Sequence, residues 1–258
     1  MWQRWIGRKK PGAEDYNGAL WTGPLTEVLV WTFDLDEIDS VASAGVLAAD
    51  ERARAARFRF DIHRNRFIAG RALLRHVLAE LTGTPPETIE FVYGEHGKPA
   101  IKAGGLHFNL SHAENRAIIG VTQAGPVGVD IERMKPDRAR PEIAGRFFAP
   151  QETQALAGLS GDVYANAFFQ IWSRKEAVLK AVGTGIGGGL SSFSVPSDEL
   201  PAPVHIPTLD CWIGNLTHAF PYLQTEGFSS AVALVAKKPL VRPVCATVLK
   251  IPVRRNLK

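Results

Sequence analysis

The sequence predicts an α+β fold in two parts, because short strand-like segments and long helix-like segments both occur along the chain. Strand-like segments are rich in Val, Ile, Thr and Trp, whereas two segments of about twenty residues place apolar side chains at helical spacing. The pattern breaks at Gln-Ala-Gly-Pro, residues 123–126, and then starts again. Each part has helices toward its beginning and strands toward its end, although no residue-by-residue repeat is visible.

The first part is expected to begin with a strand at residues 27–33, which are rich in Val, Trp and Thr. A helical region follows, with Asp50 as a candidate N-cap, and the longest helix is expected at residues 61–81. Gly83 followed by Pro85 marks the end of that helix. The other strands expected in this part span residues 89–93, 106–110 and 117–122.

The second part is expected to open with a strand at residues 127–131, whose alternate side chains face opposite sides. Its expected helices span residues 142–147, 151–159 and 163–182. Its later strands are expected at residues 192–195, 210–214 and 229–236. The chain should therefore consist of an N-terminal extension, a first half, a second half and a C-terminal tail, at residues 1–22, 23–124, 125–240 and 241–258.

Composition and charge exclude several classes of protein. Hydrophobic residues make up 45% of the 258 residues, and no apolar run approaches the length of a membrane span, so we expect no contact with a membrane. The formal charge is +4, and eight arginines fall between Arg52 and Arg75, which indicates either an anionic partner or a solvated helical face. No recognised nucleic-acid-binding motif accompanies them, so we expect no nucleic-acid partner.

The cysteines and the first residues favour a cytoplasmic protein. Cys211 and Cys245 form no C-x-x-C pair and have no His or Cys cluster beside them. Reduced thiols are therefore expected in place of a zinc site or a disulfide. Residues 1–10 are basic but lack the apolar core of a signal peptide.

Two segments carry residues suited to catalysis: residues 128–132, Gly-Val-Asp-Ile-Glu, and residues 172–180, Trp-Ser-Arg-Lys-Glu-Ala-Val-Leu-Lys. In a strand, Asp130 and Glu132 project from the same side, and in a helix Glu176 and Lys180 share one face. Three converging carboxylates offer the oxygen ligands that Mg²⁺ prefers, and a nearby lysine suits a phosphate. Taken alone, each pattern also fits a solvent-facing strand edge or an ordinary surface helix.

At these residues the chain resembles the Sfp-type 4′-phosphopantetheinyl transferases, which move the phosphopantetheine arm of coenzyme A onto a serine of a carrier protein. Both family signatures, G-(V/I)-D-(I/V)-E and (F/W)-(S/T/C)-x-K-E-(A/S)-x-x-K, are present in order. Further family features are Gly-Lys-Pro at 97–99, Phe-Asn-Leu-Ser-His at 108–112 and Arg-Phe-Phe at 146–148, which leads to Glu152. The resemblance covers roughly residues 45–235. It implies two similar α+β halves related by pseudo-twofold symmetry, with coenzyme A in the cleft between them.

The resemblance also implies roles for the signature residues. Asp130, Glu132 and Glu176 would hold Mg²⁺, and Asp130, Glu176 and Lys180 would surround the pyrophosphate of coenzyme A. Lys180 would neutralise charge on the leaving group. For the serine proton, Glu176 is the first candidate base, and Glu152 or a metal-held water is the second.

The other contacts with coenzyme A that the resemblance implies are Arg54, Lys98, Pro99, Ser111 and His112. Two positions depart from the family pattern, because Glu51 stands where some relatives have a lysine and Phe67 where some have a threonine. Arg64 or Arg66 could compensate for the missing lysine. A plain hairpin turn would also explain the Gly-Lys-Pro motif, and a lone histidine is often structural.

We therefore expect a monomeric, Mg²⁺-dependent 4′-phosphopantetheinyl transferase that uses coenzyme A as substrate. Its products would be a holo acyl or peptidyl carrier protein and adenosine 3′,5′-bisphosphate, in fatty acid, polyketide or nonribosomal peptide biosynthesis. The carrier protein is expected to dock on the second half, beginning at residues 183–190. Two other classes remain open: a phosphohydrolase that uses the same carboxylates, and a non-catalytic module that only binds coenzyme A or a carrier protein.

Overall fold

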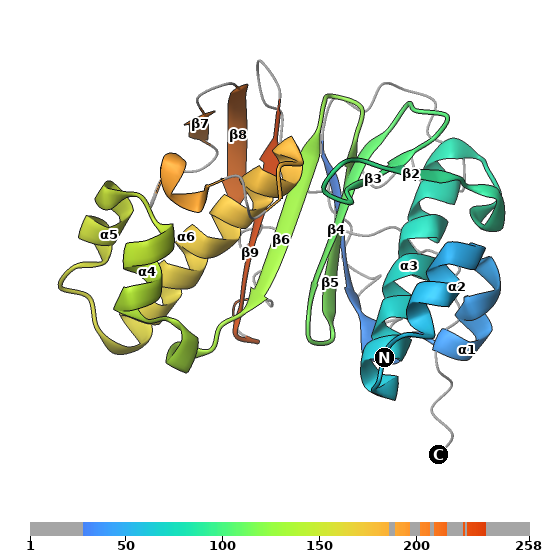
Figure 1. Ribbon diagram of the computed structural model, residues 1–258, viewed down its shortest axis with the longest axis horizontal. Coiled ribbons are helices and arrows are strands. Elements are labelled where there is room, and N and C mark those ends of the chain that lie inside the picture. Colours follow the sequence, from blue (N-terminus) through green and yellow to red (C-terminus); the bar gives the residue numbers. More distant parts are fainter. Residues whose placement is uncertain are drawn as a thin grey trace, which may run out of the picture.

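The structure, a computed structural model, describes residues 28–185, 189–196, 202–206, 209–215, 224 and 226–235. The expected extension at 1–22 and tail at 241–258 lie outside the described residues. The described residues form two α+β halves that lie side by side, and the expected fold class is confirmed (Figure 1). The exact boundary between the halves, and their pseudo-twofold symmetry, remain predictions.

The first half contains a three-stranded antiparallel sheet with the strand order β1-β5-β4. Its strands are β1 (Leu29–Asp34), β4 (His107–Ala113) and β5 (Arg116–Thr122). Its helices are α1 (Ser40–Ser43), α2 (Ala49–Ala55) and α3 (Asp61–Thr82). A separate hairpin is formed by β2 (Phe91–Tyr93) and β3 (Pro99–Ile101).

Alternating burial explains how the first half packs. Leu29, Trp31 and Phe33 point to one face of β1 and share a core with buried residues of α3. The helix ends at Gly83, whose φ of 68° lies in the left-handed region that glycine adopts readily. The helix expected at residues 61–81 is thus confirmed to within one residue at its C-terminal end.

The second half contains a four-stranded antiparallel sheet with the strand order β6-β9-β8-β7. Its strands are β6 (Val127–Arg133), β7 (Ala202–Ile206), β8 (Leu209–Asn215) and β9 (Phe228–Leu234). Its helices are α4 (Pro141–Phe147), α5 (Pro150–Leu156) and α6 (Gly161–Val182). Helix α6 crosses β6 and β9 along its length, so one helix covers the strand that adjoins the first half (Figure 1).

The two halves meet where β4 lies beside β6, and both sheets contribute to one apolar cluster there (Figure 1). Valine and isoleucine dominate this cluster, which consists of Val28, Val30, Ile118, Val127, Val129, Ile131, Phe228, Val232 and Leu234. The backbone N–H of Val129 also donates to Asn109 Oδ1 across the junction, at 2.9 Å. Apolar burial and a buried hydrogen bond therefore fix the halves relative to each other.

Gly128 allows α6 to approach β6 unusually closely. A Cβ atom at this position would lie 2.1 Å from the carbonyl oxygen of Ala177 and 2.3 Å from the backbone nitrogen of Ala181. Because both are backbone atoms of a buried helix, they cannot move aside as a flexible side chain could. Gly128 therefore sets the distance between the helix and the strand that carry the two signatures.

Several sequence-based expectations were wrong in detail. Residues 192–195 form no strand, because residues Leu190–Ser192 form a 3₁₀ turn and the carbonyls of Leu190 and Phe193 accept hydrogen bonds from Lys175. The N-cap of α2 is Ala48, not Asp50, and its N–H donates to Glu51 Oε2. Strands β3 and β7 were not anticipated. Strand β4 continues through Ser111 and His112 because it pairs with β5 around a tight turn.

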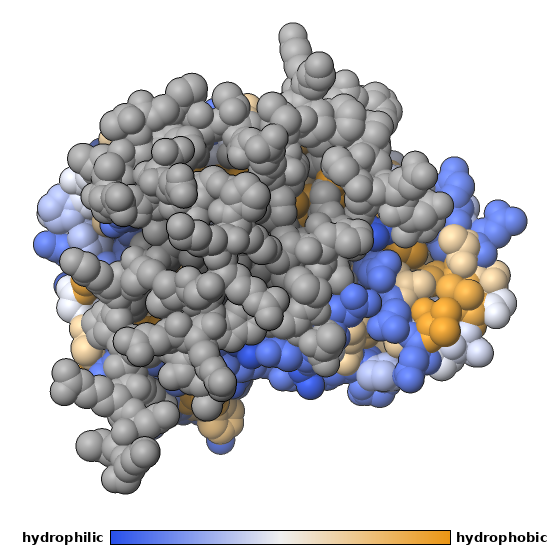
Figure 2. Space-filling view, turned by 180° about the vertical axis from the view of Figure 1, so that it is seen from behind, coloured by the Kyte–Doolittle hydropathy of each residue, from blue (hydrophilic) through white to orange (hydrophobic). Residues whose placement is uncertain are grey.

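The surface seen from behind is mostly hydrophilic where residues are described, with an apolar area on the side of the second half (Figure 2). Among the described residues, no helix is long and apolar enough to cross a membrane.

Replacing Gly128 by Ala should lower the free energy of unfolding by about 3 kcal/mol or more, because the new Cβ must displace the backbone of α6. Chemical denaturation of the purified variant measures this change. The matched control is Gly145→Ala in α4, where an added Cβ meets no other atom of the described ranges within 4 Å. That control should be neutral or stabilising by up to about 1 kcal/mol, since alanine favours a helix. Equal stabilities of the two variants would contradict the proposed constraint.

Candidate functional site

Three polar side chains from different elements meet at the junction of the two halves. The Lys180 ammonium on α6 donates to Asp130 Oδ1 on β6 at 2.5 Å and to Ser111 Oγ on β4 at 3.0 Å. The Ser111 hydroxyl donates to the same Asp130 oxygen at 3.1 Å. Asp130 is only 1% exposed. The first half, the second sheet and its covering helix therefore each supply one member of this group.

Strand and helix periodicity bring two more carboxyl groups to the same place. Glu132 follows Asp130 by two residues on β6, and Glu176 precedes Lys180 by one helical turn on α6. Glu176 is buried, whereas Glu132 is partly accessible to solvent. The indole of Trp172 donates a hydrogen bond to Glu132. The two signature segments thus converge as the sequence predicted.

The pKa values show that these carboxyl groups interact. Burial raises the pKa of Asp130, although Lys180 and Ser111 oppose this shift. Burial, followed by the charges of Asp130 and Glu176, raises the pKa of Glu132 to about 7. Burial and the charge of Asp130 also raise the pKa of Glu176. A cation placed among the three groups would relieve both the desolvation and the repulsion.

The carboxylate oxygens of Asp130, Glu132 and Glu176 are suitable ligands for a hard cation, although the three side chains are not arranged around a common point. Buried oxygens Asp130 Oδ2 and Glu176 Oε1 have no hydrogen-bond partner among the described residues. Unsatisfied buried oxygens are unfavourable unless a ligand engages them. As they stand, no three His, Cys, Asp or Glu side chains in the described part of the chain form a metal-binding group. Lys180 supplies the positive charge beside Asp130 instead.

Glu152, the second candidate base, is 4% exposed and fully engaged in the protein. Its Oε1 accepts from the Val195 N–H at 2.7 Å. Its Oε2 accepts from the Ala149 N–H at 2.8 Å and pairs with the Lys175 ammonium at 2.7 Å. Lys175 is 0% exposed. These contacts give Glu152 a structural role and leave neither of its oxygens without a partner.

Lys98, expected to contact coenzyme A, directs its ammonium into the protein. It donates to the backbone carbonyls of Val127, Lys180 and Ala181 at 3.0, 2.6 and 2.9 Å. Burial lowers the pKa of Lys98 to about 8. Its neighbour Pro99, in contrast, lines a surface pocket. The structure therefore leaves Pro99 available to a ligand and commits the Lys98 ammonium to the fold.

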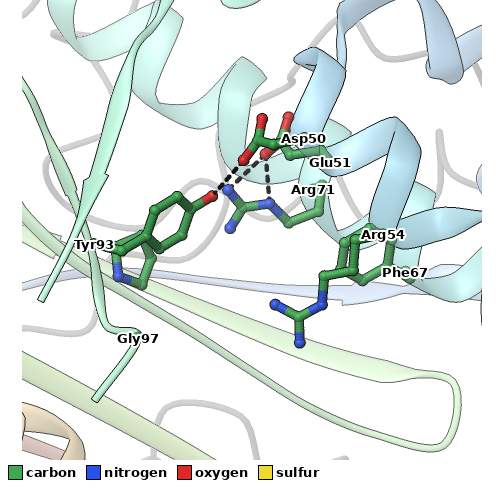
Figure 3. Close-up of a pocket in the computed structure, with 8 residues that line it drawn as sticks. Asp50, Glu51, Arg54, Phe67, Arg71, Tyr93 and Gly97 are labelled. Carbon is green, nitrogen blue, oxygen red and sulfur yellow. Dashed lines mark hydrogen bonds and ion pairs between the residues drawn. The ribbon is translucent and has the colours of Figure 1, made fainter. Parts of the chain in front are cut away.

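That pocket lies between helices α2 and α3 and the β2-β3 hairpin (Figure 3). It is lined by Asp50, Glu51, Arg54, Phe67, Arg71, Tyr93, Gly97 and Pro99. The guanidinium groups of Arg54 and Arg71 extend from the helices toward the hairpin (Figure 3). Arg54 also stacks over the Phe67 ring, 5.3 Å from its centre. Two planar cations beside one opening suit a phosphate.

Two arginines share the single carboxylate of Glu51, which therefore neutralises only one of their two positive charges. Arg71 Nε donates to Glu51 Oε1 at 2.6 Å, and the fully buried Arg75 donates to Oε2 at 2.7 Å. The two compensating candidates have partners elsewhere: Arg64 pairs with Asp61, and Arg66 binds Asp36 with two hydrogen bonds. Arg71 lines the pocket, whereas neither Arg64 nor Arg66 does.

His112 lies on β4 directly after Ser111, with much of its ring accessible. The surrounding protein, which limits hydration, and the charges of Lys180, Arg66 and His63 lower the pKa of His112. An anion bound beside the ring would counter these charges. The position is consistent with the expected phosphate contact.

Sequence reasoning missed Arg71 and Arg75 as individual residues. Their spacing of four along α3 places both on one helix face, and both belong to the noted run of eight arginines. That spacing was the available signal. It could not show that Glu51, twenty residues earlier, would be their common partner.

Two family models match the chain in succession. Residues 31–123 match the model described as 4′-phosphopantetheinyl transferase, N-terminal. Residues 126–232 match the 4′-phosphopantetheinyl transferase superfamily. The two matches adjoin near the junction of the two halves.

Individual 4′-phosphopantetheinyl transferases are also similar in sequence to this chain. The 4′-phosphopantetheinyl transferase HetI of Nostoc is 40% identical over 166 residues, which cover 62% of this chain and 70% of HetI. The 4′-phosphopantetheinyl transferase psf-1 of Bacillus pumilus is 39% identical over 175 residues, which cover 62% of this chain and 73% of psf-1. The 4′-phosphopantetheinyl transferase Sfp of Bacillus subtilis is 33% identical over 175 residues, which cover 64% of this chain and 77% of Sfp.

Replacing Glu152 by Gln should lower the free energy of unfolding by about 3 kcal/mol or more, because it leaves the buried Lys175 ammonium without a counter-charge. Urea denaturation at neutral pH measures this loss. The control is Glu142→Gln at an exposed position of α4, which should change stability by less than about 0.5 kcal/mol. If the Glu152 variant keeps wild-type stability, the structural role assigned to Glu152 is wrong.

Proposed function

This chain belongs to the 4′-phosphopantetheinyl transferase superfamily, and from that premise we propose that it transfers the 4′-phosphopantetheine moiety of coenzyme A to a serine of an apo carrier protein. The convergence of Asp130, Glu132, Glu176 and Lys180 at the junction of the halves carries this proposal. These residues come from the two signature segments, and none of them has been lost.

Asp130, Glu132 and Glu176 would hold Mg²⁺, because their carboxyl oxygens are the ligands this ion prefers. One buried oxygen each of Asp130 and Glu176, without a partner in the part of the chain that the structure describes, supports this assignment. The bound ion would neutralise charge on the pyrophosphate of coenzyme A. Lys180 would exchange its contact with Asp130 for one with a pyrophosphate oxygen, since its ammonium is partly exposed and can turn toward the substrate.

In the proposed reaction, the carrier serine oxygen forms a bond to the phosphorus that bears pantetheine. The bond from this phosphorus to the bridging oxygen breaks, and the electron pair leaves with adenosine 3′,5′-bisphosphate. Glu176 takes the serine proton, because Glu152 has partners on both of its oxygens whereas Glu176 Oε1 has none among the described residues. Much of the remaining rate enhancement would come from positioning two large substrates.

The pocket beside α2 and α3 would hold the adenosine end of coenzyme A. Arg54 and Arg71 supply cations for the 3′-phosphate, and Pro99 forms part of the wall. Ser111 and His112 extend the same site along β4 toward Lys180. This arrangement would span the cofactor from its 3′-phosphate to its pyrophosphate.

The carrier protein would dock on the second half, beginning at residues 183–190, of which residues 186–188 lie outside the described part. The net charge of +4 would attract an acidic carrier protein over a range that salt shortens to about 10 Å at 0.1 M. We propose that the enzyme acts as a monomer in the cytoplasm, on carrier proteins of fatty acid, polyketide or nonribosomal peptide synthesis.

Incubation with coenzyme A, Mg²⁺ and several apo carrier proteins should add one phosphopantetheine group to the carrier, as measured by intact mass. Asp130→Asn should lower kcat by at least about 100-fold, because it removes one charge from the site without changing its size. The exposed Asp137→Asn is the matched control and should keep wild-type turnover. Consumption of coenzyme A without a carrier would indicate a phosphohydrolase, and binding without turnover would indicate a non-catalytic module.

Coenzyme A binding should be accompanied by proton uptake near pH 6.5. The pKa of His112 lies below its ordinary value of 6.5 in the free protein, and a neighbouring phosphate dianion should raise it above that value. Calorimetric titration in two buffers with different ionisation enthalpies measures the number of protons taken up. His112→Asn should reduce the uptake, and 3′-dephospho-coenzyme A should also bind with less uptake. Identical proton uptake with both ligands would remove His112 from the 3′-phosphate site.

A further inference from the structure

The turn between β2 and β3 faces the arginine pocket on one side and the second half of the protein on the other. Gly97 and Pro99 line the arginine pocket described above. Lys98, between them, points away and reaches the second half through its ammonium. A single three-residue segment therefore borders the pocket on one side and the end of α6 on the other.

The Lys98 ammonium satisfies backbone groups that the fold would otherwise leave open. The carbonyls of Lys180 and Ala181 belong to the last turn of α6, where intrahelical N–H partners are absent. The third acceptor, the Val127 carbonyl, lies at the start of β6. An ammonium has three N–H donors, and here each has one acceptor. A positive charge is also favourable at the C-terminal end of a helix.

Two glycines at the end of α6 lie beside the same turn. A Cβ added at Gly183, the C-cap of the helix, would lie 3.6 Å from Lys98 Cδ, which is an ordinary van der Waals distance. A Cβ added at Gly185 would lie 3.5 Å from the Cβ of His96. The turn and the helix end are therefore direct neighbours.

We propose that Lys98 is a positioning residue, which fixes the end of α6, and with it Lys180, relative to the arginine pocket. The three hydrogen bonds from the Lys98 ammonium are called the Lys98 clamp. The carbonyl of Lys180 is the nearest of the three acceptors, at 2.6 Å, so the clamp holds the backbone of the residue whose side chain reaches Asp130. Movement of α6 would separate Lys180 from a substrate anchored in the pocket. This inference rests on the proposed function for its kinetic consequence, whereas the clamp itself can be tested on the protein alone.

Lys98→Met removes the donors while keeping a long apolar side chain. Hydrogen exchange should become faster at the amides of residues 180–183 in this variant, because the last turn loses its clamp. The matched control is Lys102→Met on the same hairpin, where the side chain is 64% exposed and pairs with Glu90. That control should exchange as the wild type does. Equal exchange in Lys98→Met and Lys102→Met would overturn the clamp.

Kinetics separate a positioning role from ligand binding. If Lys98 positions Lys180, Lys98→Met should lower kcat by roughly 10- to 100-fold with coenzyme A and with 3′-dephospho-coenzyme A alike. The ratio of the two KM values should stay as in the wild type. A rise in KM for coenzyme A alone would show that the ammonium binds the 3′-phosphate, and would overturn the proposal.

Wild-type protein provides a test that remains available if the Met variant does not fold. Acetylation of lysines, followed by mass spectrometry, should modify Lys98 much more slowly than Lys102, both with and without coenzyme A. Protection of Lys98 that appears only when coenzyme A is added would identify the ammonium as a ligand group and contradict the clamp. Neither this test nor hydrogen exchange requires transferase activity, so loss of the proposed function would leave both informative.

Discussion

The close approach of α6 to β6 is the constraint on which the rest of the site depends. Glycine at position 128 lets helix backbone and strand backbone come into direct contact. Only at that separation can Lys180 on the helix reach Asp130 on the strand at 2.5 Å. The strand also borders the first half, so Ser111 joins the same group. A side chain at position 128 would move the helix and separate all three elements.

Each half stabilises its long helix with one buried carboxylate, used in the same manner. Glu51 accepts the N–H of Ala48 at the start of α2, and Glu152 accepts the N–H of Ala149 at the start of α5. Each carboxylate then pairs with a fully buried cation on the following long helix. These cations are Arg75 in the first half and Lys175 in the second, and each also donates to two carbonyls in the loop after its helix. This correspondence supports the expectation of two similar halves.

Buried ionic groups therefore serve two distinct purposes in this protein. Glu51 and Glu152 have partners on both oxygens, so they hold loops and helix ends in place. Asp130 and Glu176 each keep one buried oxygen that has no partner among the described residues, and their pKa values are raised. A fully paired buried carboxylate stabilises a unique structure, whereas an incompletely paired one can engage a ligand. This difference distinguishes the scaffold from the reactive centre.

The sequence by itself determined the fold class and the limits of the two long helices to within two residues, because local periodicity and glycine stops are written in consecutive residues. The family signatures, and not periodicity, implied that Asp130 and Glu132 lie near Glu176, since these residues are more than forty positions apart. Only the tertiary structure showed the contacts of Lys98, Arg71 and Glu152, because Lys98 and Arg71 bind groups 20 to 83 residues away along the chain. Glu152 likewise pairs with Lys175 and accepts from Val195, 23 and 43 residues away. The identity of a charged residue does not reveal whether its side chain is buried, nor which residue of opposite charge lies beside it. Both depend on how helices and strands pack, and packing is a long-range property.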